Sequence, residues 1–339
     1  MVRFACLLFI LASPLVWGVT VDEQLKEAKD YLTVKPSESY RILESIDLTA
    51  NLTEEQLIEW YILYMRASLP LGKLDNLIDS VANAFEYHKS DYFSENITTI
   101  TSALGIWLRR NNYLIDAELS FKCSYRNASN DRLRVILNNS IALLARENQD
   151  LDRAKSLFEY SARLAEAGKN INMMGMINFN QGVIAFQEKK FALAEQHFRK
   201  ALDHYQSINK QSGKILAATY LLFSFVVQKE LTNYQRLYSP TFQQTEAFPN
   251  VTSKALLAWV HAGYLHHIGS QINDEMRNSL LTQFKNITDH HEQKLIEKHL
   301  AKPLGISLKL PEVKVHVERF NARWFALVRQ CNFNQIVHP

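Results

Sequence analysis

Apolar and polar residues alternate with helical spacing along most of the chain, most clearly in FNQGVIAFQEKKFALAEQHFRKALDHY, residues 179–205. Gly182 precedes Ala194 by twelve residues across the charged turn EKK, and Phe191 and Phe198 flank that alanine. Two antiparallel helices that pack closely need small residues where their backbones approach and large ones in the remaining gap. The stretch therefore predicts a helix pair with Gly182 and Ala194 at the contact, the two phenylalanines in the gap, and a turn that needs only polarity.

The same spacing recurs upstream of this pair. Gly105 precedes Ala117 by twelve residues, and Ala142 precedes Ala154 by the same number. The alanines step by 37 residues from Ala117 to Ala154 and by 40 from Ala154 to Ala194. One helix pair cannot bury its own apolar face, so pairs at this step must stack. Each pair should exceed the common repeat of about 34 residues, either by about one helical turn or by a longer connection.

The pattern weakens toward both ends of the chain. Ser39 and Leu77 take the small-residue positions of two opening pairs, and after Tyr234 the repeat fades although helical periodicity persists. The stretch SPTFQQTEAFPN, residues 239–250, is expected to break or bend the stack as a loop. Behind Pro311, a stripe at helical spacing favours a terminal capping helix, although the alternation VKVHV also permits a strand. The stripe consists of Val313, Val317, Phe320, Trp324, Leu327 and Cys331.

The pattern resembles the tetratricopeptide repeat, and the match is best over residues 175–208. It rests on Gln181, Gly182, Ala185, Phe186, Phe191, Ala194, Phe198 and Ala201. The long step resembles the long-helix repeats of bacterial regulatory and sensory proteins. The resemblance implies an all-α, right-handed superhelical solenoid of antiparallel helix pairs, with about 14 to 16 helices. It would extend over residues 19–339, with the clearest repeats at 98–208 and atypical capping helices at 250–339.

The first 18 residues, MVRFACLLFILASPLVWG, have the features of a signal peptide. One arginine precedes an apolar run from Phe4 to Leu11, and Val16 and Gly18 suit the −3 and −1 positions of a cleavage site. The alternative is an uncleaved anchor, for which the run is too short. We predict cleavage after Gly18 and an exported product, periplasmic or secreted.

Composition argues against two other classes of protein. The 339 residues include 38 Lys and Arg against 35 Asp and Glu, a net charge of +3 without a basic block, which does not suggest a nucleic-acid partner. The best later candidate for a membrane span, residues 215–228, has 14 residues, whereas a spanning helix needs about 20. We expect a buried helix there, in a protein that is not integral to a membrane.

Two cysteines, Cys123 and Cys331, remain after cleavage. A disulfide between them would close a very long loop, and a secreted chain held by disulfides usually has more cysteines. The sequence leaves the bridge open and favours two small apolar side chains.

Six Asn-x-Ser/Thr sequons occur, and in a eukaryotic secretory protein they would accept glycans. They begin at Asn51, Asn96, Asn127, Asn138, Asn250 and Asn286. Asn51, Asn96 and Asn250 lie just before helical runs, where Asn and Thr serve as caps. We therefore interpret the sequons as capping residues of a bacterial protein.

The sequence carries no signature of a catalytic or metal site. It lacks G-x-S-x-G, a phosphate-binding loop and a local Cys-His motif. The segment from His261 to His299 is rich in histidine, but HHE at residues 290–292 does not match the metal-binding motif H-E-x-x-H. The remaining alternative is a metal site in which His267 and His290 meet across helices. We expect no metal, no cofactor and no enzymatic activity.

Partner binding is expected on the concave face of such a solenoid, which the first helix of each pair lines. The inward register of the repeat family, carried onto this chain, gives twelve residues on three successive repeats, and six of them are our candidates. They are Arg109, Arg110, Asn139, Arg146, Phe179 and Phe186. The guanidinium groups would grip carboxylates of a peptide, and the phenylalanines would take an apolar side chain. The family's carboxylate clamp of Lys and Asn is not reproduced. The alternative is that the arginines are solvated and the phenylalanines pack between repeats.

Two functions follow from these expectations. The first is a non-enzymatic scaffold or regulator of the periplasm that binds a protein or peptide, with a sensory subunit for the outer domain of a membrane signalling protein as a special case. The alternative is a scaffold or helical enzyme in cell-surface polysaccharide assembly or turnover. An enzyme of that kind needs paired acids, which the sequence does not bring together.

Overall fold

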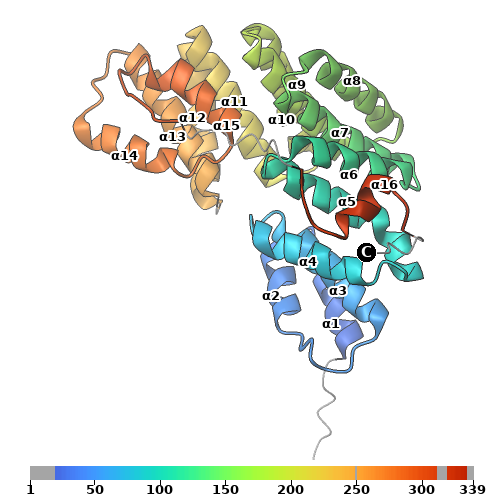
Figure 1. Ribbon diagram of the computed structural model, residues 1–339. Helices are drawn as coiled ribbons and strands as arrows, with labels where there is room; N and C mark the ends of the chain where they lie inside the picture. Colours follow the sequence, from blue (N-terminus) through green and yellow to red (C-terminus); the bar gives the residue numbers. More distant parts are fainter. Residues whose placement is uncertain (1–19, 249, 311–318, 334–339) are drawn as a thin grey trace, which may run out of the picture. The chain divides into compact units, whose positions relative to one another are not determined.

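The computed structural model of the protein describes residues 20–248, 250–310 and 319–333. The predicted signal peptide lies outside this range. The described residues form sixteen α-helices and one π-helical turn, and none of them is in a β-strand (Figure 1). Helices adjacent in sequence pack in pairs, which confirms the predicted all-α solenoid class and the expected number of helices. The chain divides into two compact units, residues 1–96 and 97–339, and each is described by itself.

The first unit contains two helix pairs and the start of a fifth helix. Its helices are α1 (Val21–Tyr31), α2 (Pro36–Glu44), α3 (Glu54–Ser68), α4 (Leu74–Glu86) and the first turns of α5 (Asp91–Arg110). α1 and α3 begin at capping boxes, because Thr20 and Thr53 each accept a hydrogen bond from the backbone three residues on. In turn, the side chains of Glu23 and Gln56 accept hydrogen bonds from the backbone N–H groups of Thr20 and Thr53.

The core of the first unit gathers around an aromatic side chain. Trp60 is buried, and its Nε1 donates to the carbonyl oxygen of Leu43 at 2.9 Å. Ser39 and Leu77, the residues expected at the small positions of the opening pairs, are fully buried. The weak opening repeats of the sequence are therefore real helix pairs.

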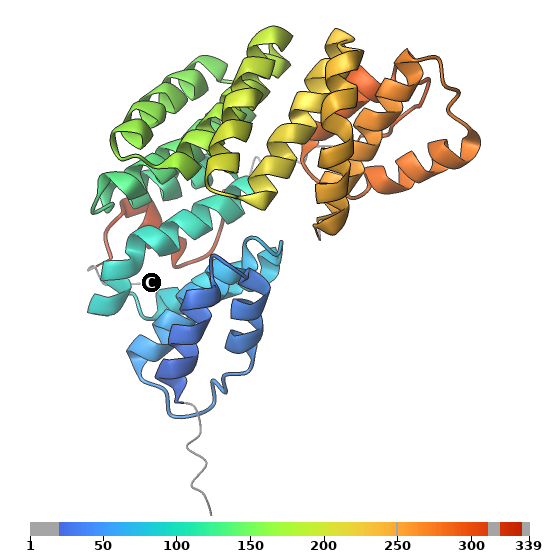
Figure 2. The ribbon, with the colours of Figure 1, turned by 180° about the vertical axis from the view of Figure 1, so that it is seen from behind.

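The second unit continues with long helices. They are α6 (Leu114–Arg126), α7 (Asp131–Glu147), α8 (Leu151–Ala167), α9 (Ile171–Gln187), α10 (Phe191–Ser207), α11 (Gln211–Gln228) and α12 (Leu231–Ala247), which follow α5. Each helix from α6 to α12 packs against the next, and α9 also contacts both α7 and α11 (Figures 1 and 2). The first helices of successive pairs therefore form one layer, called here the inner layer.

The predicted close contact within a helix pair is confirmed at Gly182. A Cβ atom at Gly182 would lie 2.5 Å from Cε1 of Phe198, far inside contact distance. Gly105 has the same relation to Phe121, at 2.6 Å. Ala194 is fully buried, as predicted. The aromatic ring of the second helix thus fills the space that the glycine of the first helix leaves free.

The long repeat step comes from long helices. α7, α8, α9 and α10 have 17 residues each, and three residues join α9 to α10. Of the two explanations that the step allowed, longer helices and longer connections, the first applies here.

The turns need more than polarity, and the prediction for EKK is wrong on this point. Lys189 has a φ of 63°, in the left-handed region that side chains rarely adopt. Its N–H bonds to the carbonyl of Phe186 at 3.0 Å, and the N–H of Lys190 bonds to that of Ala185 at 2.8 Å, which is the Schellman arrangement that ends a helix. The same backbone recurs at Asn112, Gln149, Lys169, Asn209 and Lys229. Glycine, the usual residue for this conformation, is absent from all six positions. The sequence therefore gives no signal that these turns need a left-handed backbone conformation.

The loop predicted at residues 239–250 is wrong for most of its length, because α12 continues through Pro240 to Ala247. Pro240 lacks a backbone donor, but it is exposed, so water reaches the carbonyl that it leaves free. Tyr234, earlier in the helix, is fully buried and stacks on Tyr264 with 4.3 Å between ring centroids. Packing of the helix thus outweighs the local turn signal.

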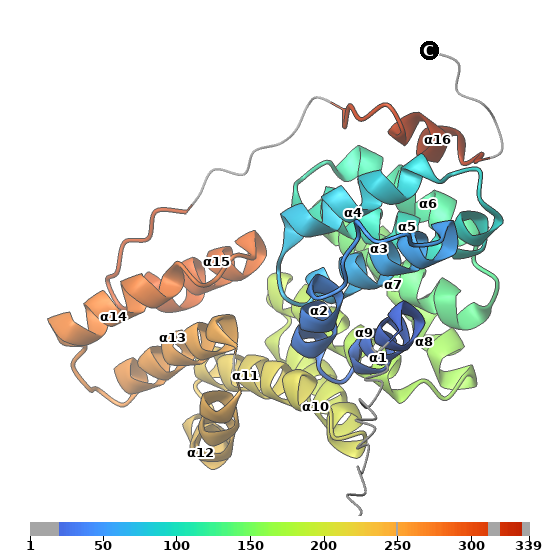
Figure 3. The same ribbon diagram turned by 90° about the horizontal axis from the view of Figure 1, so that it is seen from below.

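Less regular helices follow α12. They are α13 (Val251–His267), α14 (Asp274–Phe284), α15 (His290–Ile296), the π turn Glu297–Ala301 and α16 (Phe325–Gln330). α13 packs on α11 and α14 (Figure 3). Leu295, Ile296 and Leu300 of α15 and the π turn are buried in the same core as α11. The end of the chain therefore folds back onto the helix pairs.

The prediction of one terminal helix behind Pro311 is wrong for the part that the structure describes, residues 319–333. Residues 319–324 are not helical and α16 has six residues, while residues 311–318 lie outside the described range. α16 packs against α6 and does not extend the series of pairs.

A disulfide holds this last segment to α6. Cys123 and Cys331 are bridged, with 5.3 Å between their Cα atoms, so the interpretation as two separate apolar side chains is wrong. Asp116, also on α6 and fully enclosed, accepts hydrogen bonds from Nε of Arg319 at 2.8 Å and from the backbone N–H of Phe320 at 2.7 Å. A contact between residues 208 positions apart has no local signal in the sequence.

Two of the three capping predictions are confirmed. Oδ1 of Asn250 accepts from the N–H of Ser253 at 2.8 Å and caps α13, and Thr53, in the sequon that begins at Asn51, caps α3. Asn96 lies inside α5, which corrects the third.

The apolar stretch at residues 215–228 is the buried helix α11, as predicted. In the part of the chain that the structure describes, no helix combines the length and the apolar character needed to cross a membrane.

Candidate partner-binding site

A pocket of about 190 Å³ lies where the inner layer of the second unit meets α15. We call it the inner-layer pocket. Its walls come from α5 (Arg109), α7 (Leu143, Arg146), α9 (Phe179, Asn180, Val183), α11 (Tyr220) and the α15 region (Asp289, His291, Glu292, Leu295). Among these lining residues, none belongs to the second helices of the pairs. The first helices thus present their side chains here, in the register expected from the sequence.

Arg146 is the most unusual group in the pocket. Only 6% of the residue is exposed, and its Nε has no hydrogen-bond partner in the described residues. No ion pair within 4.0 Å joins its guanidinium group to a described carboxylate, since the adjacent Glu147 pairs with Arg109. Buried donors are almost always satisfied, and a buried charge is costly without a partner. Arg146 therefore brings to the wall of the pocket a buried cationic group that has an unsatisfied donor and no ion pair within 4.0 Å among the described residues.

Arg109, in contrast, is neutralised within the protein. Its Nη1 forms an ion pair with Glu147, and both side chains are largely buried, at 16% and 15% exposed. Burial raises the pKa of Glu147, against the opposite pull of Arg109 and Arg146. The pair fixes the end of α7 against α5.

The acidic wall belongs to α15. Glu292 accepts a hydrogen bond from the Tyr220 hydroxyl at 2.8 Å. Burial, reinforced by the charge of Asp289, raises the pKa of Glu292 to about 7. Asp289 itself accepts from the N–H groups of His291 and Glu292 at 2.9 and 3.0 Å and so caps α15. Both carboxylates are therefore engaged in bonds that hold α15 in place.

His291 completes the polar wall. Burial, together with the nearby charge of Arg146, lowers the pKa of His291. Its Nδ1 lies 3.5 Å from Nε2 of Gln187 on α9. Burial at this position therefore favours the neutral imidazole.

The opposite wall is apolar and aromatic. The ring of Phe179 lies edge-on to Tyr220, with 4.9 Å between centroids, and is half-buried. Leu143, Val183 and Leu295 line the remainder. The pocket thus combines one free cationic group with an apolar surface.

The six residues proposed from the sequence lie in four different surroundings. Arg109, Arg146 and Phe179 line the inner-layer pocket. Asn139 is buried behind it, where its Oδ1 accepts from Nδ2 of Asn180 at 3.0 Å, and Arg110 is exposed outside the lining.

Phe186 is the sixth residue, and its assignment to a partner surface has to be corrected. It is fully buried, and its ring lies 4.8 Å from Phe223 and 5.5 Å from His299, centroid to centroid. The π turn after α15 covers this side of α9, so Phe186 packs within the protein, as the alternative interpretation had it.

Sequence reasoning missed the residues of α11 and α15. Tyr220 had a signal: Arg109, Arg146, Val183 and Tyr220 follow one another at equal steps of 37 residues. Extending the register by one more repeat would have found it. Asp289, His291 and Glu292 had none, because their place depends on the chain folding back.

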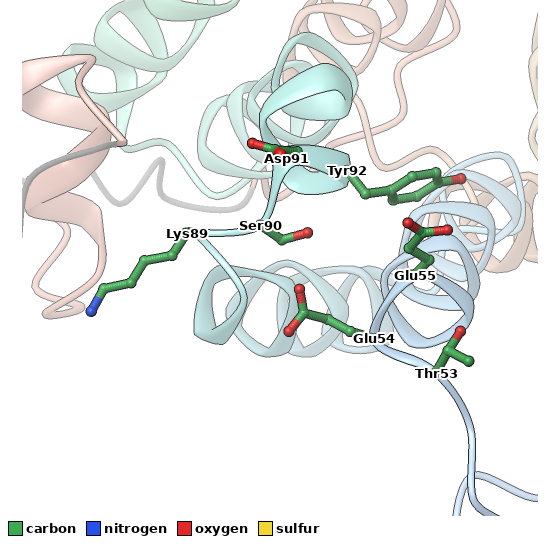
Figure 4. Close-up of a pocket in the computed structure, with 7 residues that line it drawn as sticks. All are labelled: Thr53, Glu54, Glu55, Lys89, Ser90, Asp91 and Tyr92. Carbon is green, nitrogen blue, oxygen red and sulfur yellow. The ribbon is translucent and has the colours of Figure 1, made fainter.

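A second hollow lies in the first unit, by the N-terminal ends of α3 and α5 (Figure 4). It measures about 630 Å³ and is lined by Thr53, Glu54, Glu55, Lys89, Ser90, Asp91 and Tyr92. Lys89 extends away from the other six residues, and Thr53 is engaged in its capping box. This wide hollow has a mainly polar and acidic rim, and none of its seven residues has a buried side-chain atom without a partner. It suggests no ligand.

The histidine-rich segment packs through its rings. His261 stacks on Tyr238 with 4.2 Å between centroids, and its Nδ1 lies 3.0 Å from the hydroxyl of Tyr234. Across the described ranges, no group of three or more His, Cys, Asp or Glu side chains is placed to hold a metal ion.

The fold is that of an all-α helical-repeat protein, and a pocket lies on its inner layer. No protein-family model matches the sequence. No curated protein matches it either.

Solved structures similar to the chain include three that each match most of its length. The crystal structure of aspartyl phosphate phosphatase F from Bacillus subtilis has a TM-score of 0.47 and 12% identity and covers 89% of this chain and 99% of its own. The apo form of RapI has a TM-score of 0.41 and 11% identity, covering 82% and 97%. A Rap protein complexed with competence and sporulation factor has a TM-score of 0.43 and 10% identity, covering 84% and 97%. At these values the function has to be argued from this chain's own residues.

Proposed function

We propose that the protein is a non-enzymatic repeat protein of tetratricopeptide type, and that it binds a peptide or protein segment at the inner-layer pocket. The observation that carries this proposal is Arg146, a buried charge without a partner on the wall of a pocket that the first helices of successive pairs create. A group of this kind lowers stability, and a site for a ligand is where such a cost is expected.

We further propose that the protein works outside the cytoplasm, in the periplasm. The apolar N-terminal segment supports this as a signal peptide. The disulfide between Cys123 and Cys331 supports it independently, because disulfides persist mainly in oxidising compartments. A role as a sensory subunit for the outer domain of a membrane signalling protein is the special case that we favour.

One observation favours the alternative of a helical enzyme in polysaccharide turnover. Asp289 and Glu292 share the inner-layer pocket, and a pKa raised to about 7, as for Glu292, suits a general acid. Both carboxylates are already engaged, however, Asp289 as the cap of α15 and Glu292 with Tyr220. We therefore assign them to holding α15 in place, and binding remains the proposed function.

A peptide library displayed on phage tests the proposal. The mature protein should select peptides that bind with micromolar or tighter dissociation constants in calorimetry. Leu143→Gln, which makes a wall of the inner-layer pocket polar, should weaken them at least tenfold. Leu193→Gln is the matched control, because Leu193 is 42% exposed on the second helix α10. Failure to select any peptide, or equal affinity in both variants, would reject the proposal.

A further inference from the structure

The polar groups around the inner-layer pocket indicate what its ligand must offer. Arg109 and Glu147 neutralise each other, and Asp289 is held by two backbone N–H groups. Glu292 accepts from Tyr220. Among the lining residues, Arg146 is the one with a buried side-chain donor, Nε, that has no hydrogen-bond partner in the described residues. A guanidinium group has five N–H donors and no acceptor, so only a group that accepts hydrogen bonds can satisfy it.

The acids that remain nearby limit the charge of that ligand. A carboxylate carries one negative charge and matches the guanidinium fork with two parallel hydrogen bonds. A phosphate would bring a charge nearer to −2 into a pocket that Asp289 and Glu292 already line. Like-charge repulsion therefore favours the carboxylate.

The size and the walls of the pocket limit what can accompany the carboxylate. A volume of about 190 Å³ is below the roughly 300–1,000 Å³ of pockets that hold drug-sized ligands. Phe179, Leu143 and Val183 present apolar surface to that space. One short apolar or methylene stem fits, and several consecutive residues of a peptide do not.

The protein's own chain closes the direction along the inner layer. Leu295 lines the pocket, and Ile296 and Leu300, which follow it, are buried against the core of α11 and α13. Phe186, the next inward residue of α9 after Val183, is covered by His299 of the π turn. An extended peptide therefore has no open groove to lie in on that side.

We infer that the inner-layer pocket binds a single carboxylate on a short apolar stem, inserted end-on, with Arg146 as its anchor. The inference rests on the proposed function in one respect, namely that the carboxylate belongs to a partner peptide, as its free C-terminus or an acidic side chain. A free small acid presents the same chemistry, and the experiment separates the sources.

Calorimetry with matched acids and amides tests the inference on the mature protein. The probes are 4-methylpentanoate and its amide, the acetylated tripeptide Ala-Ala-Leu as acid and as amide, acetyl-Ala-Glu-Ala-amide, and inorganic phosphate. We expect at least one carboxylate to bind and any matching amide to bind at least tenfold more weakly, because a guanidinium group pairs with the charged form. Binding of the tripeptide acid or the internal glutamate, without 4-methylpentanoate, identifies a peptide source.

Arg146→Met keeps a long side chain, removes the charge, and should weaken the carboxylate at least tenfold. Arg110→Met is the matched control, since Arg110 is exposed outside the pocket. Loss of a buried unpaired charge should not lower stability, and a melting curve checks this. Should Arg146→Met nevertheless fail to fold, the ratio of acid to amide affinity of the wild type decides whether the pocket requires a carboxylate.

The inference is overturned if no carboxylate binds, if acid and amide bind alike, if Arg146→Met leaves affinity unchanged, or if phosphate binds more tightly than every carboxylate. Its failure is separable from that of the proposed function. If Leu143→Gln weakens the library peptides but neither their amidation nor Arg146→Met changes their affinity, the carboxylate anchor is refuted and the proposed function stands. Free acids that bind in the absence of any selected peptide would retain the anchor and refute the peptide partner.

Discussion

Two residues in van der Waals contact, Gly182 and Phe198, hold α9 and α10 close together. Because a Cβ atom on Gly182 would lie 2.5 Å from the ring of Phe198, Gly182→Ala should lower the free energy of unfolding by about 1–3 kcal/mol through overpacking. Gly168→Ala is the control, since the nearest neighbour of an added Cβ atom would be the carbonyl oxygen of Leu164 at 3.3 Å, and we expect a change within about 0.5 kcal/mol. Urea unfolding measures both. Equal effects would show that the crossing has room to relax.

Glu292 should make stability depend on pH. Its pKa is about 7 in the folded state against an ordinary value of 4.5, so between these values the folded protein holds a proton that the unfolded chain has lost. The stability of the wild type therefore falls as the pH rises through this range. Glu292→Gln keeps an acceptor for Tyr220 and removes the titration. The variant should gain relative to the wild type from pH 4.5 to 7, by up to about 3 kcal/mol, and then level off.

Chemical unfolding at pH 4.5, 6 and 8 measures this gain. Glu188→Gln is the control with the opposite sign, because hydrogen bonds from Lys190 and Lys155 lower the pKa of Glu188. Its loss of stability should be largest above pH 4.5 and should shrink toward lower pH. A gain in Glu292→Gln that is the same at every pH would contradict the raised pKa.

At the scale of elements, the helix ends carry avoidable strain. Lys189 ends α9 with a φ of 63°, and glycine adopts this conformation at little cost. Lys189→Gly should therefore raise the free energy of unfolding by about 1 kcal/mol. Lys200→Gly, in the middle of α10, should lower it by about 1 kcal/mol, since glycine is a poor helix former. Thermal melts of both variants test the assignment, and a loss of stability at Lys189→Gly would show that its side chain contributes more than its backbone costs.

At the scale of the molecule, the disulfide fastens the final described segment to the second unit. Reduction, or Cys123→Ser together with Cys331→Ser, should release residues 319–333 and lower the melting temperature. The chain-entropy relation sets an upper limit of about 5 kcal/mol for a loop of 208 residues. The effect should be smaller, because the terminal segment can detach while the helix pairs stay folded.

Limited trypsin digestion with mass spectrometry measures that release. Cleavage after Arg323 or Arg329, both exposed beside the buried Phe325, should accelerate when the disulfide is reduced. Sites in α10 should be cut at an unchanged rate and serve as the internal control. Equal rates at Arg323 with and without the disulfide would mean that Asp116 and Arg319 hold the segment by themselves.

Export is the second prediction at this scale. The apolar run and small residues before Val19 predict a mature chain that begins there. N-terminal sequencing of the protein from a soluble periplasmic fraction checks this. A chain that still begins at Met1 and sediments with membranes would refute both the cleavage and the proposed compartment.

The sequence by itself determined the helix pairs of this protein. Contacts between neighbouring helices require small residues at a fixed spacing, so they produce a periodic pattern in the sequence. Gly182 and Ala194 show this spacing, and Gly105 and Ala117 repeat it. The same register placed Arg109 and Arg146 on the inner layer. Local signals failed where packing opposed them, as at Pro240, which stays helical because α12 is held elsewhere by Tyr234.

Only the tertiary structure decided what surrounds those arginines. Glu292 and Asp289 reach the inner-layer pocket because α15 folds back onto α11, and the disulfide joins positions 208 residues apart. Neither event leaves a period or a short motif in the sequence. The same folding back covered Phe186 and placed Asp289 and Glu292 beside Arg146, which narrowed a predicted groove to a pocket. Register fixes which side chains face inward, whereas long-range packing fixes which of them remain available to a ligand.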